Sequence, residues 1–247
     1  MNLKIGWLYP DLMSTYGDRG NVIALLYRAR SRGIGATVIT ISVADSVDKI
    51  NRADLFFMGG AQDLQQEIVA KDLRAEKGIY LKKAIERGIP GLYICGAFQF
   101  LGKYYKTSEG KILEGLDIFD LYTQSGQEKE KRLVGDMVFN PYFAPDKRFV
   151  GFENHNGRTY LGKGTQPFGK ILKGFGNNGK DGTEGMVYKN SIGSYSHGPL
   201  LPKNPELTDW LVQKALQLKY KRKIKLKNLD TKYEDLARKT VIKKLID

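Results

Sequence analysis

The chain has 247 residues, a single cysteine and a formal net charge of +13. One cysteine excludes an internal disulfide and a thiolate zinc cluster, and favours a reducing cytoplasm. No stretch approaches the ~20 apolar residues of a membrane-spanning helix, and the early Pro10 argues against a signal peptide. Residues 219–247 hold eleven Lys and Arg against four acids, so the charge indicates a basic tail rather than a nucleic-acid-binding body.

In the first half of the chain, apolar runs alternate with helical patterns. Strands are predicted over residues 3–8, 36–41, 55–58 and 91–94, and helices over 22–32, 62–67, 78–87 and 98–104. This alternation is typical of βαβ units, which form a parallel sheet with sites at the carboxyl ends of its strands.

The second half contains shorter apolar runs separated by turn residues. Strands are predicted over 133–139, 149–152, 159–161, 171–172, 185–188 and 192–195. We expect these to be antiparallel or mixed strands that extend the first sheet. A last helix is predicted over 205–219, with Asn204 as its N-cap. The expected organisation is one α/β domain over 1–218 and a solvated, partly helical basic extension over 219–247.

Cys95 stands between an apolar run and the small residues Gly96 and Ala97, which open a helix. This order is that of a nucleophile elbow, in which a strained turn exposes the side chain and the helix N-terminus favours the thiolate. A lone cysteine is more often a small buried apolar residue. A catalytic assignment therefore requires a histidine elsewhere in the chain.

The chain has two histidines. His197 ends a predicted strand at a Gly-Pro turn, so it can meet Cys95 at one edge of the sheet and act as its general base. The alternative is a structural histidine that forms hydrogen bonds within the turn. His155 follows the polar residues Glu153 and Asn154, and a structural role or a place at the mouth of the site both remain open. Two adjacent ligands do not define a metal site, so no metal is expected.

Six short motifs occur in order along the chain. They are Tyr-Gly-Asp-Arg-Gly-Asn (16–21), Met-Gly-Gly-Ala-Gln-Asp (58–63), Ile-Cys-Gly-Ala-Phe-Gln (94–99), Arg-Leu-Val-Gly-Asp (132–136), Gly-Phe-Glu-Asn-His-Asn-Gly-Arg-Thr (151–159) and Gly-Ser-Tyr-Ser-His-Gly-Pro-Leu-Leu-Pro (193–202). Together they resemble the class I glutamine amidotransferases of the cobyric acid synthase (CobB/CobQ) type, over residues 3–218. Within this family they are most similar to the glutaminase subunits of lipid II isoglutaminyl synthases. One such motif is weak evidence, whereas six in order are specific.

The resemblance implies the class I amidotransferase fold, a mostly parallel central sheet flanked by helices with a mixed or antiparallel extension. It also implies hydrolysis of glutamine to glutamate and ammonia. Cys95 matches the nucleophile that forms a glutamyl thioester, and His197 matches the base that activates the thiol and then protonates ammonia.

Four further positions match the family's substrate-binding residues. Gly60 and Gly96 match the backbone donors of the oxyanion hole, where glycine lets the substrate approach the main chain. Gln99 and Arg132 match positions that hold the backbone groups of glutamine, and the arginine fork suits an α-carboxylate.

The third member of the catalytic triad is not evident after the histidine. Many relatives place a glutamate two residues beyond it, but here Pro199 occupies that position and Leu200 follows. We expect the carboxylate to come from a partner subunit, so that assembly activates the chain. Asp18 is the internal alternative.

The resemblance implies a heterodimer with a MurT-like Mur ligase subunit. That partner would use ATP and Mg²⁺ to amidate the D-glutamate α-carboxyl of lipid II in peptidoglycan biosynthesis. No Walker A motif occurs in this chain, so no cofactor is expected in it. We expect a cytoplasmic protein, at the inner face of the membrane through the complex, where the basic tail can contact anionic lipid. The alternatives are a glutaminase serving cobyric-acid-type amidation, and an inactive interaction module.

Overall fold

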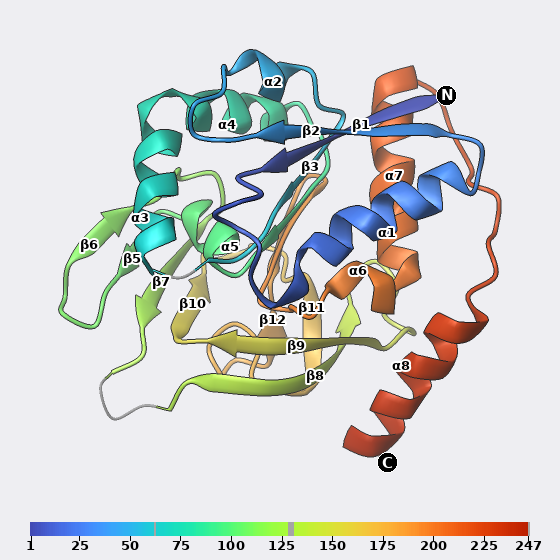
Figure 1. Ribbon diagram of the computed structural model, residues 1–247. Coiled ribbons are helices and arrows are strands. Elements are labelled where there is room, and N and C mark those ends of the chain that lie inside the picture. Colours follow the sequence, from blue (N-terminus) through green and yellow to red (C-terminus); the bar gives the residue numbers. More distant parts are fainter. Residues whose placement is uncertain (62, 128–130, 247) are drawn as a thin grey trace.

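A six-stranded sheet forms the centre of the computed structural model, which describes residues 1–61, 63–127 and 131–246 (Figure 1). Its strands run in the order β13-β14-β4-β3-β1-β2, and all neighbours are parallel except β13 and β14. They comprise β1 (Asn2–Leu8), β2 (Gly35–Ile41), β3 (Leu55–Met58), β4 (Gly91–Ile94), β13 (Met186–Tyr188) and β14 (Ser191–Ser194). The predicted parallel α/β core is therefore confirmed.

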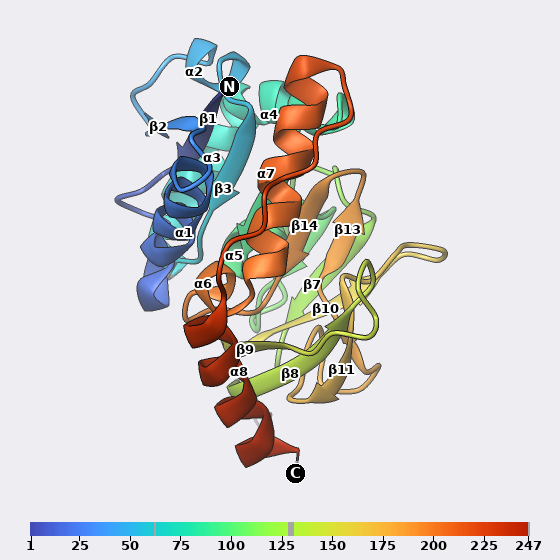
Figure 2. The same cartoon turned by 90° about the vertical axis from the view of Figure 1, so that its right-hand side faces the viewer.

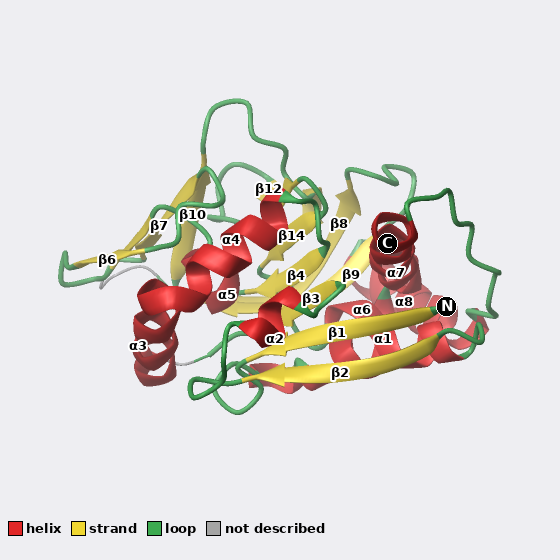
Figure 3. Ribbon diagram, turned by 90° about the horizontal axis from the view of Figure 1, so that it is seen from above, coloured by secondary structure: helices red, strands yellow, loops and turns green. Residues whose placement is uncertain are grey.

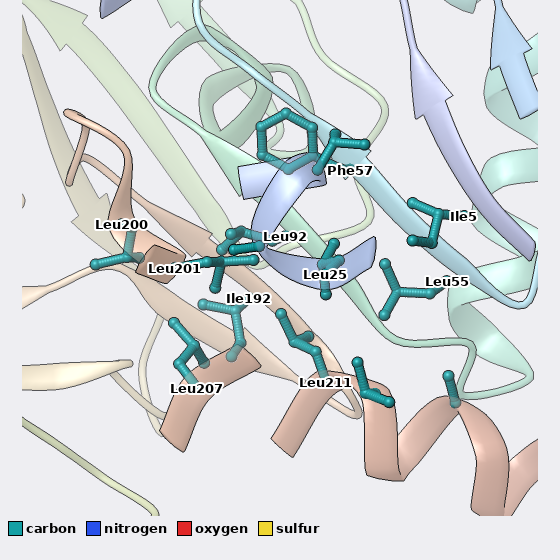
Figure 4. Close-up of a cluster of buried hydrophobic side chains, with 14 of the residues drawn as sticks. Ile5, Leu25, Leu55, Phe57, Leu92, Ile192, Leu200, Leu201, Leu207 and Leu211 are labelled. Carbon is teal, nitrogen blue, oxygen red and sulfur yellow. The ribbon is translucent and has the colours of Figure 1, made fainter. Parts of the chain in front are cut away.

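The central strands are apolar throughout because helices cover both faces of the sheet. Along β3, Leu55 and Phe57 belong to one buried cluster, whereas Phe56 and Met58 belong to the other. The helices α1 (Arg19–Arg30), α6 (Leu200–Lys203) and α7 (Pro205–Tyr220) cover the first face (Figure 4). The opposite face is covered by α2 (Asp48–Asn51), α4 (Gly78–Glu86) and α5 (Gly96–Phe100). Figure 3 shows helices on both sides of these strands.

Between β3 and α4 the helical region is longer than predicted. Here α3 (Asp63–Asp72) leads through one π-helical turn, Leu73–Lys77, directly into α4. Lys77 is buried in this turn, and its ammonium group donates to both carboxylate oxygens of Asp72 at 2.9 and 2.8 Å. The short helix α5 begins at Gly96, immediately after Cys95 and two residues before the predicted start.

The second half of the chain forms two additional four-stranded sheets rather than one extension. One has the order β10-β7-β5-β6 and the other β12-β11-β8-β9. Their strands are β5 (Tyr104–Lys106), β6 (Ile112–Glu114), β7 (Leu121–Ser125), β8 (Leu133–Pro141), β9 (Phe149–His155), β10 (Gly157–Leu161), β11 (Gly169–Lys173) and β12 (Thr183–Glu184). Most neighbouring strands in these two sheets pair antiparallel, whereas β5 and β7 pair parallel. Of the strands predicted in the second half, only β13 and β14 extend the main sheet, so the expectation is wrong for β8–β11.

The basic tail packs against the body of the protein. Ile224 is buried in the core, and α8 (Lys232–Leu245) contacts α6, β8 and β9. The guanidinium of Arg238 donates to both carboxylate oxygens of Glu206, at 2.7 and 2.8 Å. Figures 1 and 2 show α8 below α7, beside the β8–β9 pair, with the two termini at opposite ends of the molecule. In the parts that the structure describes, no helix combines the length and apolar character needed to cross a membrane.

Candidate active site

Cys95 lies on a strained turn at the carboxyl end of β4. Its backbone has φ 54° and ψ −107°, a conformation that costs a non-glycine residue about 1–3 kcal/mol. The turn is held because the Cys95 N–H donates to Ser194 O at 2.8 Å and the Cys95 carbonyl accepts from Gln99 N–H at 3.0 Å. These bonds fix the backbone of the elbow, and Cys95 as a whole is half-buried.

His197 reaches the same place from the neighbouring strand, β14. Its backbone pairs with Phe152 of β9, with N–H donation at 2.6 Å in one direction and 3.2 Å in the other. A Cβ on Gly60 would lie 2.8 Å from His197 Cε1 and 3.2 Å from Cys95 Cβ. The nucleophile and the base therefore flank one glycine at the carboxyl edge of the sheet.

Asp18 completes the group from the loop before α1. Its Oδ1 lies 3.3 Å from His197 Nδ1, and both side chains are fully buried. The other oxygen, Oδ2, accepts the N–H of Gly60 at 2.8 Å, while the N–H of Thr15 donates to Gly60 O at 3.2 Å. Asp18 thus occupies the position for which we expected a carboxylate from a partner subunit. The structure favours the internal alternative, because the 9–18 loop folds back over the ends of β1 and β3.

The electrostatics of His197 favour its charged form. Burial lowers its pKa, but the Cys95 thiolate and the hydrogen bond and charge of Asp18 outweigh this effect and raise the pKa of His197 to about 10. With Nδ1 facing a carboxylate, Nδ1 carries the proton and Nε2 is the nitrogen available for the thiol. A charged imidazole beside Cys95 is the setting in which a cysteine acts as a nucleophile.

Gly60 and Gly96, the two predicted oxyanion-hole residues, differ in whether their N–H groups are already hydrogen-bonded. The N–H of Gly60 is committed to Asp18, so the structure does not support it as an oxyanion donor. Its contribution is space, since any side chain would meet His197 and Cys95. Gly96 is buried at the first position of α5, where an N–H has no acceptor within its own helix. It remains a suitable donor for an oxyanion next to the thiol.

Gln99, predicted to hold the backbone groups of glutamine, lies beside Tyr195. It is buried, and its Nε2 donates to the phenol oxygen of Tyr195 at 3.1 Å. That oxygen also lies 2.6 Å from Thr159 Oγ1. Gln99 therefore belongs to a buried polar layer with Tyr195 and Thr159.

His155 lies in the same buried layer. Its ring stacks on Tyr195 with centroids 3.7 Å apart, its Nδ1 lies 2.8 Å from Gly157 O, and its Nε2 lies 3.4 Å from Glu153 Oε2. Burial lowers the pKa of His155 despite the opposing effect of Glu153. Of the two roles left open, the structure supports the structural one.

Arg132 lies at the surface above the site. Its Nε donates to Asn154 Oδ1, and its Nη2 donates to Asn154 O at 3.1 Å. Asn154 Nδ2 in turn donates to the phenol oxygen of Tyr16 at 2.9 Å, and the Tyr16 ring meets the His197 ring edge-on at 5.1 Å. Sequence reasoning did not select Tyr16 or Asn154, although both fall inside the quoted motifs.

Comparisons with known proteins show the family of the chain. Residues 4–205 match the CobB/CobQ-like glutamine amidotransferase domain. The chain belongs to this family. The predictions of family and fold class are thereby confirmed.

Two similar curated proteins are named lipid II isoglutaminyl synthase (glutamine-hydrolyzing) subunit GatD. The one from Staphylococcus aureus is 46% identical over 218 residues, which cover 88% of this chain and 86% of the relative. The one from Streptococcus pneumoniae is 41% identical over 246 residues, covering 99% and 91%. A solved glutamine amidotransferase shares the fold, with a TM-score of 0.60 and 15% identity, covering 85% of this chain and 98% of that one.

Proposed function

We propose that this chain is the glutaminase subunit of a lipid II isoglutaminyl synthase. The proposal rests above all on one observation: Cys95 stands on a strained elbow with His197 and Asp18 buried beside it. It is supported by the high identity to the two GatD subunits over most of both chains.

The reaction follows from the roles of these groups. The Cys95 thiolate attacks the side-chain amide carbon of glutamine, and the resulting oxyanion faces backbone donors such as Gly96. The His197 imidazolium gives its proton to the departing ammonia, which leaves a γ-glutamyl thioester. Neutral His197 then takes a proton from water, whose oxygen attacks the thioester, and glutamate departs as the thiolate returns. Asp18 holds the imidazole in one tautomer and stabilises its charged form.

The ammonia passes, in this proposal, to a MurT-like ligase subunit that amidates the α-carboxyl of D-glutamate in lipid II. ATP and Mg²⁺ are bound by that partner. The complex works in the cytoplasm on a membrane-anchored precursor. Exposed Tyr233 and Leu236 on α8, flanked by lysines such as Lys239, are suited to contact with anionic lipid.

The experiment is depletion of this chain in its own cells, followed by mass analysis of the peptidoglycan stem peptides and co-purification of the tagged chain. We expect loss of the isoglutamine amide, a ligase subunit in the purified complex, and ammonia release from glutamine. A stem peptide that stays fully amidated after depletion contradicts the proposed acceptor. Ammonia release with a different ligase would instead point to another amidation reaction.

A further inference from the structure

The loop that carries Asp18 also carries an unusual tyrosine. Tyr16 has φ 52° and ψ 32°, a left-handed conformation that is unfavourable for a bulky residue. Its side chain is 48% exposed, yet its ring lies edge-on against the buried His197, with centroids 5.1 Å apart, and against Phe152 at 6.4 Å. A strained and half-exposed residue keeps such a position only when its contacts hold it there.

Asn154 holds Tyr16 in this position through a hydrogen bond. Phe152 and Asn154 are two residues apart on β9, so their side chains point to the same face of the strand. The Asn154 amide uses both of its ends: Nδ2 donates to the Tyr16 phenol oxygen at 2.9 Å, and Oδ1 accepts from Arg132 Nε. One amide therefore fixes both the aromatic cover of the general base and the guanidinium above the site.

The orientation of Arg132 depends on the same residue. Its Nε and Nη2 are both bound to Asn154, through the side-chain and main-chain oxygens. The edge of the guanidinium that contains Nη1 faces away from these bonds, and it is the edge that a substrate carboxylate can approach with two parallel hydrogen bonds.

We infer that Tyr16 and Asn154 are positioning residues that connect the carboxylate-binding Arg132 to His197. Asn154 orients Arg132 for the α-carboxylate of glutamine. Its hydrogen bond to the Tyr16 hydroxyl also holds the Tyr16 ring against one side of the His197 imidazole. This inference rests on the proposed glutaminase function. It predicts that the two residues act as one unit.

The test is a double-mutant cycle in glutamine hydrolysis, using the full chain purified from its own cells with the subunit that accompanies it. Asn154→Ala removes both side-chain bonds, and we expect a KM increase of about tenfold. Tyr16→Phe removes only the hydroxyl, and we expect a KM increase of about threefold. The double variant should be no worse than Asn154→Ala alone, because both changes break the same link.

Tyr16→Ala removes the ring as well. It should lower kcat about tenfold beyond the effect of Tyr16→Phe, since His197 loses its cover. Tyr27→Ala, a change at an exposed tyrosine of α1, is the matched control and should leave both constants unchanged. KM factors that multiply in the double variant, or unchanged constants in both single variants, would overturn the inference.

Alkylation of Cys95 by iodoacetamide gives a readout that does not depend on glutamine. Tyr16→Ala should change the rate of Cys95 alkylation by at least about threefold, because the Tyr16 ring lies against His197, the base beside the thiol. Tyr27→Ala should leave this rate unchanged. A wild-type chain that releases no ammonia speaks against the proposed function. A wild-type chain that is active, with an alkylation rate unaltered by Tyr16→Ala, speaks against this inference alone.

Discussion

Cys95, His197 and Asp18 come from three separate segments and meet around one glycine. Gly60 gives its N–H to Asp18 and leaves room for the two reacting side chains. The same residue thus orients the carboxylate and allows the thiol to approach the imidazole. Its lack of a side chain is a requirement of the site rather than of the fold.

Replacing Gly60 with alanine tests this requirement. The new Cβ would lie 2.8 Å from His197 Cε1, closer than real Cβ contacts, so the imidazole must move away from Cys95. We expect glutamine hydrolysis to fall at least about 100-fold with little change in Tm, because a misplaced catalytic group costs about that factor. Gly135→Ala on β8, where a Cβ meets nothing within 4 Å, is the control. Equal activity in the two variants would contradict this role.

Asp18→Asn probes the internal carboxylate. An amide cannot accept from both His197 Nδ1 and the Gly60 N–H, so it favours the wrong tautomer or leaves one donor unpaired. We expect kcat to fall about 10³-fold while the chain stays folded. The measurement is ammonia release by the assembled complex. Activity near the wild-type level in that complex would mean that a carboxylate of the partner performs the role after all.

The raised pKa of His197 makes part of the stability depend on pH. Its folded value of about 10 lies above the ordinary 6.5, so the stabilisation is fully present below pH 6.5 and is lost as the pH rises through about 10. In denaturant titrations, wild type should therefore lose more stability between these limits than His197→Gln does. Parallel pH curves for the two proteins would show that His197 is not held charged.

At the residue scale, the sequence was enough to select Cys95 and His197, which the structure brings together beside Gly60. Arg132 was selected through the family resemblance, and its role in binding glutamine stays a prediction. An elbow and a strand-closing histidine have local patterns that can be read along the chain. The role of Asp18 depends on how a ten-residue loop folds back, and the direction of the Gly60 N–H depends on Asp18. The hydrogen bond from Gln99 to Tyr195 could not be predicted, because a helical position one turn beyond the elbow does not show which way the side chain points.

At the element scale, α8 shows how a charged tail can be fixed to a body. Arg238 is about nine-tenths buried between Glu206 of α7 and Asp235 of its own helix. Glu234 adds a contact to Arg28 at 3.8 Å. The positive charge of the tail gave no sign of this anchoring, because charge counts do not show which cation has a carboxylate in reach.

Arg238→Ala should release α8. We expect a loss of about 1–2 kcal/mol in the free energy of unfolding, given two charge-assisted bonds to a partly exposed carboxylate. Limited proteolysis should cut the 221–231 connection faster in this variant. Lys239→Ala removes the adjacent, exposed charge of α8. The protease should cut this variant at the wild-type rate. Equal cleavage of all three proteins would show that the ion pair does not hold the helix.

The strands that sequence reasoning missed include β5, β6, β7 and the two-residue β12. They are short and partly polar, and none of them is buried along its whole length. Such strands exist because neighbours pair with them, and pairing is not visible in a local pattern. The buried strands β3 and β4 were predicted to the residue because a strand covered on both faces is apolar along its whole length.

At the scale of the whole molecule, the pairing of β4 with β14 creates the site. The two strands run parallel in register, from Gly91 opposite Ser191 to Ile94 opposite Ser194. Cys95 and His197 follow the ends of these strands, so residues about a hundred positions apart meet at one edge of the sheet. The long insertion between them supplies β9, which pairs with the backbone of His197 from the other side.

The most direct test of the account is acid-quenched mass analysis of the Cys95 peptide during turnover of glutamine. We predict a mass increase of one glutamyl group on Cys95 in the wild-type complex. The increase should form and decay more slowly in His197→Gln and be absent from Cys95→Ser. Steady release of ammonia by Cys95→Ser at the wild-type rate, with no adduct on Cys95 in the wild type, would contradict the central claim.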